Sequence, residues 1–164
     1  VLHHMEDPML GWKVLTDSLK VGGLMRIGLY SDLARKPVAD VRKNIAASNL
    51  PISDDKILSI REKIILSDKK NDKQIKSWKD FYSLSELRDL LFHVQEHRFT
   101  ILQIKDCLSN LGLDFCGFGE SDIISSFLEK HNKSDLYNLD QWALFEKSNP
   151  RVFSGMYQFW CQKK

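Results

Sequence analysis

Hydrophobic positions in this chain follow two patterns, helical spacing and short continuous runs, which together are typical of an α/β protein. The first helix is predicted to begin at Asp7-Pro8 and to reach about Leu19. An acidic cap there precedes a proline at the first helical position, where the missing N–H costs nothing. This helix is predicted to bury an apolar stripe made of Leu10, Val14 and Leu15.

The glycines of "KVGG" permit a left-handed exit from that helix. The run "GLMRIGLYS", residues 23–31, is short and nearly all apolar, which predicts a strand buried on both faces. A helix, a glycine turn and a buried strand form the closing half of a right-handed crossover unit. We therefore expect "VLHHM", residues 1–5, to be the tip of the strand that opens the unit.

Residues 32–100 have helical spacing, which predicts helices near 33–48, 54–67 and 84–97. Between the last two, the lysine-rich segment 67–80 is predicted to be a solvated loop.

The C-terminal part returns to an α/β pattern. Thr100 is predicted to cap a helix that Gly112 closes. Two further strands are predicted at 113–119 and 155–162, separated by helices at 121–130 and 139–148.

Composition limits the functional classes. The chain has 164 residues, with 24 basic and 22 acidic side chains, so its charge gives no argument for binding nucleic acid. The chain has no apolar run of the roughly 20 residues that a membrane helix needs. The cysteines fit reduced thiols rather than a disulfide framework, because they are odd in number: Cys107, Cys116 and Cys161. We expect a soluble cytoplasmic protein without a membrane partner.

Residues 1–31, "VLHHMEDPMLGWKVLTDSLKVGGLMRIGLYS", resemble the middle of class I S-adenosylmethionine-dependent methyltransferases. In that family the fourth strand ends in a V-L-H-H-like turn, and an L-K-P-G-G turn leads into the fifth strand. Here Val21 stands where proline is usual. Residues 81–119 and the closing "FSGMYQFWCQK" are similar to the C-terminal half of a bacterial subgroup that is commonly fused behind tetratricopeptide repeats.

The resemblance implies a partial Rossmann-like sheet in a single domain, residues 1–164. It implies that the C-terminal strand is antiparallel and inserted between the fifth and sixth strands, giving the order 23–31, 155–162, 113–119. Residues 32–100 would then be a helical insertion on the substrate side, where loops set the choice of methyl acceptor.

The same resemblance sets the expected cofactor. The family holds S-adenosylmethionine with a glycine-rich turn after the first strand and an acidic residue at the end of the second. No G-x-G-x-G occurs in these 164 residues. We therefore expect a methyltransferase-like fragment that begins at the end of the fourth strand, binds no S-adenosylmethionine by itself and is inactive alone.

Candidate site residues follow from the place of each residue in the predicted sheet. His3 and His4 end the first strand, at the carboxyl edge where open α/β sheets bind ligands, so either could contact cofactor or substrate. Tyr30 and Ser31 end strand 23–31 at the same edge and could line a substrate cleft. In the structural alternative, His3 packs, His4 only caps the turn, and Tyr30 is a half-buried aromatic with its hydroxyl in water.

The segment "HVQEH", residues 93–97, matches the H-x-x-E-H signature of inverted zinc proteases. His93 and His97 would share a helix face and could bind zinc, with Glu96 as the base. No third ligand follows at a defined spacing, so a polar stripe of Glu86, Asp89, His93 and His97, facing solvent or substrate, explains the pattern equally well.

Two partners are expected. Strand 23–31 would have an open apolar edge, which favours pairing with a second copy of the chain to form a homodimer. The family resemblance adds tetratricopeptide repeats upstream. A non-catalytic dimerising or scaffolding module and a zinc-dependent hydrolase remain as alternative functions.

Overall fold

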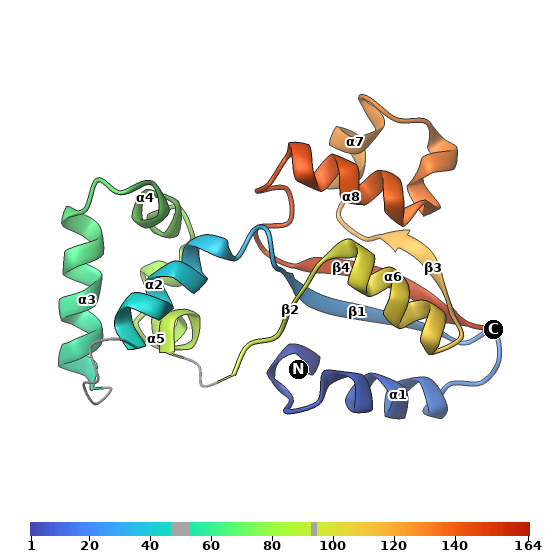
Figure 1. Ribbon diagram of the computed structural model, residues 1–164, viewed down its shortest axis with the longest axis horizontal. Coiled ribbons are helices and arrows are strands. Elements are labelled where there is room, and N and C mark those ends of the chain that lie inside the picture. Colours follow the sequence, from blue (N-terminus) through green and yellow to red (C-terminus); the bar gives the residue numbers. More distant parts are fainter. Residues whose placement is uncertain (47–52, 93–94) are drawn as a thin grey trace. The chain divides into compact units, whose positions relative to one another are not determined.

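The computed structural model describes residues 1–46, 53–92 and 95–164 (Figure 1). The chain divides into two compact units, one made of Val1–Ala34 with Gln95–Lys164 and the other of Arg35–Val94. None of the helices in the described ranges is long and apolar enough to cross a membrane.

The first unit contains a mixed sheet of four strands in the order β2-β1-β4-β3. These are β1 (Leu24–Ser31), β2 (Arg98–Phe99), β3 (Leu113–Phe118) and β4 (Tyr157–Lys163). β4 is antiparallel to both of its neighbours, whereas β1 and β2 are parallel. The three predicted strands are therefore present in the predicted relative order. The predicted number of strands, three, was wrong, because β2 has only two residues and is too short to show any periodicity.

Only one face of this sheet is buried. Ile27 pairs with Phe159 and Leu29 with Tyr157, and all four side chains lie in the core. On the other face, Leu24 is 54% exposed. The prediction that residues 23–31 are buried on both faces is therefore wrong, since an apolar run does not reveal whether a second layer covers it.

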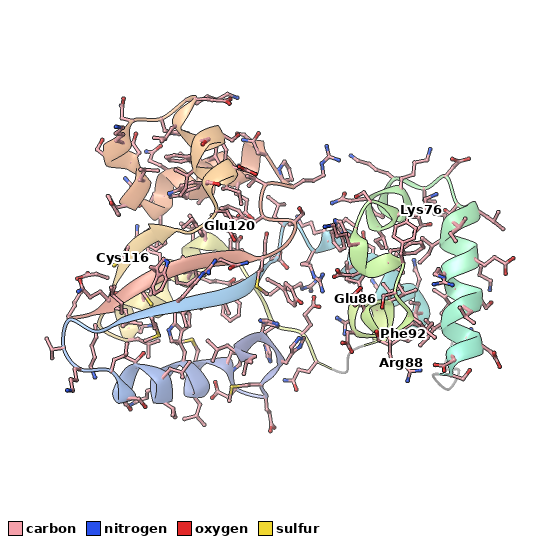
Figure 2. The ribbon with its side chains drawn as sticks, turned by 180° about the vertical axis from the view of Figure 1, so that it is seen from behind. Lys76, Glu86, Arg88, Phe92, Cys116 and Glu120 are labelled. Carbon is pink, nitrogen blue, oxygen red and sulfur yellow. The ribbon has the colours of Figure 1, made fainter. Side chains whose placement is uncertain are left out.

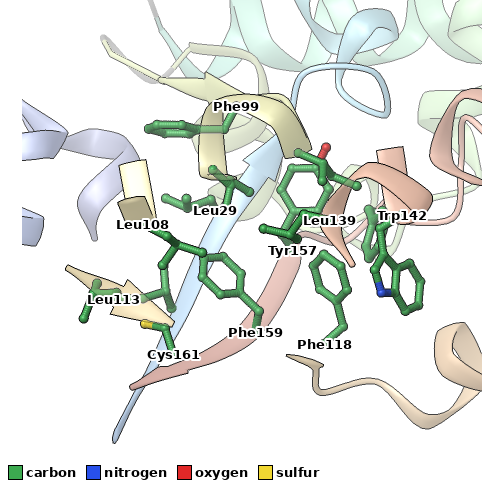
Figure 3. Packing of buried hydrophobic residues seen from close by; sticks show 14 of the residues in the cluster. Leu29, Phe99, Leu108, Leu113, Phe118, Leu139, Trp142, Tyr157, Phe159 and Cys161 are labelled. Atoms are coloured by element: carbon green, nitrogen blue, oxygen red, sulfur yellow. The ribbon is translucent and has the colours of Figure 1, made fainter. Parts of the chain in front are cut away.

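Four helices complete the first unit: α1 (Pro8–Ser18), α6 (Ile101–Asn110), α7 (Ser121–Leu128) and α8 (Leu139–Ser148). A 3-10 helix, η3 (Lys133–Tyr137), precedes α8. Figure 3 shows residues of the core that they build with the sheet, among them Leu108, Trp142, Tyr157 and Phe159.

Both predicted helix caps are confirmed. Asp7 Oδ1 accepts hydrogen bonds from the amides of Met9 and Leu10, at 2.9 and 3.0 Å. Thr100 forms a capping box with Gln103, in which each side chain bonds the other residue's backbone amide.

α1 buries a different face from the predicted one. Trp12 is fully buried, and its ring centroid lies 6.0 Å from that of Phe159. Because Trp12 faces the sheet, the expected stripe faces solvent: exposure is 59% for Leu10, 57% for Val14 and 47% for Leu15.

Residues 1–5 also differ from expectation. Leu2–His4 form a 3-10 helix, η1, rather than the tip of a strand. The amide of His4 donates to the Val1 carbonyl at 3.0 Å, and that of Met5 to the Leu2 carbonyl at 3.1 Å. These local hydrogen bonds close the backbone into a turn.

The second unit is helical, with α2 (Lys36–Ala46), α3 (Asp54–Leu66), α4 (Lys70–Lys76), the 3-10 helix η2 (Lys79–Phe81) and α5 (Leu84–Phe92). An Arg88–Asp54 ion pair joins α5 to α3 (Arg88 is labelled in Figure 2). The predicted loop at 67–80 is wrong, because Ile75 of α4 is fully buried and supplies the apolar contact that folds this polar segment.

Candidate functional site

Three of the predicted site residues lie together at the carboxyl end of β1. The ring centroid of His3 is 4.2 Å from that of His4 and 4.3 Å from that of Tyr30. His4 and Tyr30 are 6.1 Å apart. Open α/β sheets bind ligands at this edge, so we call His3, His4, Tyr30, Gln95 and His97 the edge cluster.

The segment before β2 completes the edge cluster. The backbone amide of His97 donates to the His3 carbonyl at 2.8 Å. His4 Nδ1 lies 2.9 Å from the Gln95 carbonyl oxygen, and Gln95 Nε2 lies 2.9 Å from His97 Nε2. These hydrogen bonds join residues 95–97 to η1, although the two segments are far apart in the sequence.

These partners determine which histidine nitrogens carry protons. A carbonyl oxygen only accepts hydrogen bonds, so Nδ1 is the donor in His4 and also in His3, where it lies 3.4 Å from the Gly28 carbonyl. In the neutral ring the lone pair is then on Nε2. Neutral His97 has the same tautomer, because its Nε2 accepts from the Gln95 amide and its proton is therefore on Nδ1.

The two adjacent histidines differ in their access to solvent. His3 is 4% exposed, and burial lowers the pKa of His3 from 6.5 to about 4. His4 is half-buried. His3 is therefore a neutral packing residue near pH 7, and His4 presents the more accessible ring.

A second polar group is formed around a buried carboxylate. Glu146 of α8 is 5% exposed. Its Oε1 accepts from the Ser31 hydroxyl at 2.6 Å, and both carboxylate oxygens accept from the Tyr157 hydroxyl. Burial raises the pKa of Glu146 and that of Tyr157.

The hydrogen bond to Glu146 accounts for the full burial of Ser31. The Ser31 hydroxyl also accepts a hydrogen bond from the Ala34 amide at 3.0 Å. Ser31 follows Tyr30, so the two side chains lie on opposite faces of β1. The hydroxyl of Ser31 is inside the protein, whereas Tyr30 belongs to the edge cluster.

Sequence reasoning missed Glu146, although a signal was present. Glu146 is four residues after Trp142 and seven after Leu139, so it shares the buried face of α8. A carboxylate on an apolar helix face requires hydrogen-bond partners. Gln95 carried no comparable signal.

The H-x-x-E-H segment is not the continuous helix that was predicted. α5 ends at Phe92, and Gln95–His97 are not helical, so the stripe of Glu86 and Asp89 does not extend to His97. His93 lies outside the described residues. Across the described ranges, His, Cys, Asp and Glu side chains form no group of three that could hold a metal ion.

The glycines do not fit a cofactor cradle. Gly22 donates its amide to the Lys163 carbonyl, and Gly119 donates to that of Gln158, each at 2.8 Å. Both amides are therefore used in the sheet rather than turned toward a ligand. These residues alone do not fit a complete S-adenosylmethionine site.

An open groove of about 450 Å³ lies between α6, the start of β3 and the start of α8. Lys105 pairs with Asp140 at 2.6 Å, and Lys164 pairs with Asp114 at 3.2 Å. Since both lysines are paired with carboxylates, the groove has no clear preference for anions. None of the predicted site residues lines it.

No family model matches the chain. The chain is similar to an uncharacterized protein, syc1184_c, from a Synechococcus strain, with 26% identity over 129 residues. The matched region is 74% of this chain but 31% of that protein, so the chain spans about a third of the length of its cyanobacterial relative.

Proposed function

We propose that this chain is the part of a class I S-adenosylmethionine-dependent methyltransferase domain that carries the fifth, sixth and seventh strands. It takes part in methyl transfer only together with residues that supply the glycine-rich cofactor turn. In such a domain the protein mainly holds the methyl group in line with its acceptor and excludes water.

The strand order supports this proposal most strongly. β4 is the last strand in sequence, and it lies between β1 and β3, antiparallel to both. The family resemblance implies the same arrangement of the last three strands. The edge cluster at the end of β1 adds support, since ligands bind at that edge in open α/β sheets. We further propose that residues 32–100 select the methyl acceptor.

Calorimetry with S-adenosylmethionine tests the proposal. Two samples are compared, the 164-residue chain and the full product of its gene, with any residues encoded before Val1. We expect the full product to bind S-adenosylmethionine and the 164-residue chain not to bind it. S-adenosylhomocysteine is added to both samples as a competitor and should abolish the binding by the full product. A full product that fails to bind would overturn the proposal. Binding by the 164-residue chain would overturn the requirement for a glycine-rich turn.

A homodimer through β1 is the second candidate. β2 pairs with β1 only at Tyr30 and Ser31, and within the described part of the chain no strand lies beside the rest of β1 on that side. His3 Nδ1 lies 3.4 Å from the Gly28 carbonyl, so the stretch of β1 left for pairing is Leu24–Ile27, and an open strand edge favours pairing with another chain. Two copies could join there about a twofold axis.

Light scattering tests the dimer. Leu24, at the start of β1, is 54% exposed, and Val21, in the preceding turn, is 80% exposed. We expect a dimeric mass for the native chain and for Val21→Lys, and a monomeric mass for Leu24→Lys, because a charge on an edge strand opposes pairing. A monomeric native chain would rule out this interface.

A further inference from the structure

We propose that the open groove of the first unit is a binding site for a neutral carbohydrate. The groove has a volume of about 450 Å³ and lies between α6, the start of β3, η3 and the start of α8. That volume is within the usual range for small-ligand pockets, roughly 300–1,000 Å³. The inference goes beyond the proposed methyl transfer and does not depend on it.

The first argument is an exposed aromatic ring. Tyr137 of η3 lines the groove and is 65% exposed. Its Cε1 lies 3.9 Å from the position that a Cβ would occupy at Gly117, whose φ of +106° is readily adopted only by glycine. The ring therefore lies against backbone while much of its surface stays open. Aromatic rings with a polar tip suit ligands that have both apolar and polar parts, and a sugar ring combines a face of C–H bonds with hydroxyl groups.

Hydrogen bonds hold η3, and with it this ring, in place. The Asp135 carboxylate accepts from the Asn132 amide at 3.0 Å. The indole N–H of the core residue Trp142 donates to the Leu136 carbonyl, also at 3.0 Å. These bonds position Tyr137 before a ligand arrives, which reduces the ordering cost of binding.

The second argument is the balance of charge. Two lysines line the groove, and each is paired with a carboxylate: Lys105 with Asp140 at 2.6 Å, and Lys164 with Asp114 at 3.2 Å. An anion would compete with the two carboxylates, and a cation would compete with the two lysines. A hydroxyl group competes with neither, because it can donate to a carboxylate oxygen and accept from an ammonium group. Each pair therefore offers both a donor and an acceptor to a neutral ligand.

Uncharged side chains complete the lining. No described residue forms a hydrogen bond with the hydroxyls of Ser109, Ser134 and Tyr137, all of which line the groove. Leu108 and Phe115 add apolar surface. A ring that carries several hydroxyl groups matches this mixture better than an ion or a purely apolar molecule does.

Chemical-shift perturbation in ¹H–¹⁵N NMR spectra of the 164-residue chain tests the proposal. The probes are neutral disaccharides, namely maltose, lactose and N,N′-diacetylchitobiose, titrated to tens of millimolar. We expect at least one of them to bind saturably and to shift the amides of residues 105–115 and 134–140. No saturable shift with any of these probes, or shifts confined to other residues, would overturn the proposal.

Charged relatives of glucose test the argument from charge. Glucuronate is an anionic relative and glucosamine a cationic one. We expect neither to bind more tightly than glucose. An affinity about ten-fold higher for either charged sugar would overturn the assignment to a neutral ligand.

Two tyrosines offer a matched pair of variants. Tyr137→Ala removes the ring at the groove and should weaken binding of the disaccharide about ten-fold. Tyr82→Ala removes a ring of similar exposure, 67%, in the second unit and should leave binding unchanged. The same spectra show that both variants are folded, and native affinity in Tyr137→Ala would overturn the proposal. None of these measurements uses S-adenosylmethionine, so a failure here is distinguishable from a failure of the proposed function.

Discussion

The hydroxyl of Tyr157 lies 2.7 and 2.8 Å from the two carboxylate oxygens of Glu146, inside the core of the first unit. The same carboxylate accepts from Ser31 at 2.6 Å. One buried side chain on α8 thereby joins the ends of β1 and β4. Hydrogen bonds to a charged group are stronger than those between neutral groups, so this carboxylate should couple the three elements energetically.

A double-mutant cycle tests that coupling. Glu146→Ala leaves two buried hydroxyls without an acceptor and is expected to lower the free energy of unfolding by about 3 kcal/mol. Tyr157→Phe is expected to lower it by about 1–2 kcal/mol. The double variant should lose less than the sum by about 1 kcal/mol. Urea denaturation measures all four proteins, and strict additivity would contradict the coupling.

Glu146 also predicts a pH dependence. Burial raises the pKa of Glu146, so above its unfolded pKa the folded state retains a proton that the unfolded state has lost. The contribution of Glu146 to stability is therefore full below the unfolded pKa and is lost as pH rises through the folded pKa. The stability difference between the native chain and Glu146→Gln should fall as pH rises from 4.5 to 8 in urea titrations. A stability difference that stays constant with pH would show that the pKa of Glu146 is not raised.

His3 predicts the opposite dependence. Because burial lowers the pKa of His3 from 6.5 to about 4, the unfolded chain binds a proton in this range that the folded chain does not. The contribution of His3 to stability should therefore rise with pH from 4 to 6.5 and then level off. His3→Asn keeps an N–H for the Gly28 carbonyl and should lose this slope. Urea titrations at several pH values make the comparison, and equal slopes would show that His3 titrates normally.

α1 offers a matched pair for its buried and exposed faces. Trp12→Ala should lower the free energy of unfolding by about 3–5 kcal/mol, because the indole is fully buried. Leu10→Ser, on the exposed face of the same helix, should change it by about 0.5 kcal/mol or less. Thermal or urea unfolding distinguishes the two. A larger loss of stability for Leu10→Ser than for Trp12→Ala would mean that α1 buries the face that the sequence pattern predicted.

Local signals in the sequence predicted most elements of the first unit. Asp7-Pro8 and Thr100 indicated helix starts because capping depends on adjacent residues alone. The runs that became β1 and β4 were apolar enough to identify as strands. The order β1-β4-β3 came from the family resemblance, since no local pattern determines which strands pair.

Long-range packing accounts for the predictions that failed. Nothing near Leu10 in the sequence indicates that Trp12 will take the buried position against Phe159. In the segment 67–80, one buried isoleucine, Ile75, outweighs the polar composition. Four of the five residues of the edge cluster were candidates from the sequence: His3, His4, Tyr30 and His97. The link from His4 to His97 through Gln95 was not predicted, because it depends on a fold that brings residues 1–5 beside residues 95–97.

Photolabelling with methyl-labelled S-adenosylmethionine tests whether the cofactor binds at the end of β1. The full product of the gene is irradiated with the labelled compound, digested with trypsin and mapped. Trypsin cleavage after Lys13, Arg26 and Arg35 places the edge cluster in the peptide that ends at Lys13, in residues 27–35 and in the peptides around residues 95–97. We expect saturable label in the first two peptides, competed by S-adenosylhomocysteine. Label confined to the groove residues near Lys105 and Tyr137, or no saturable label, would contradict a methyltransferase site at the end of β1.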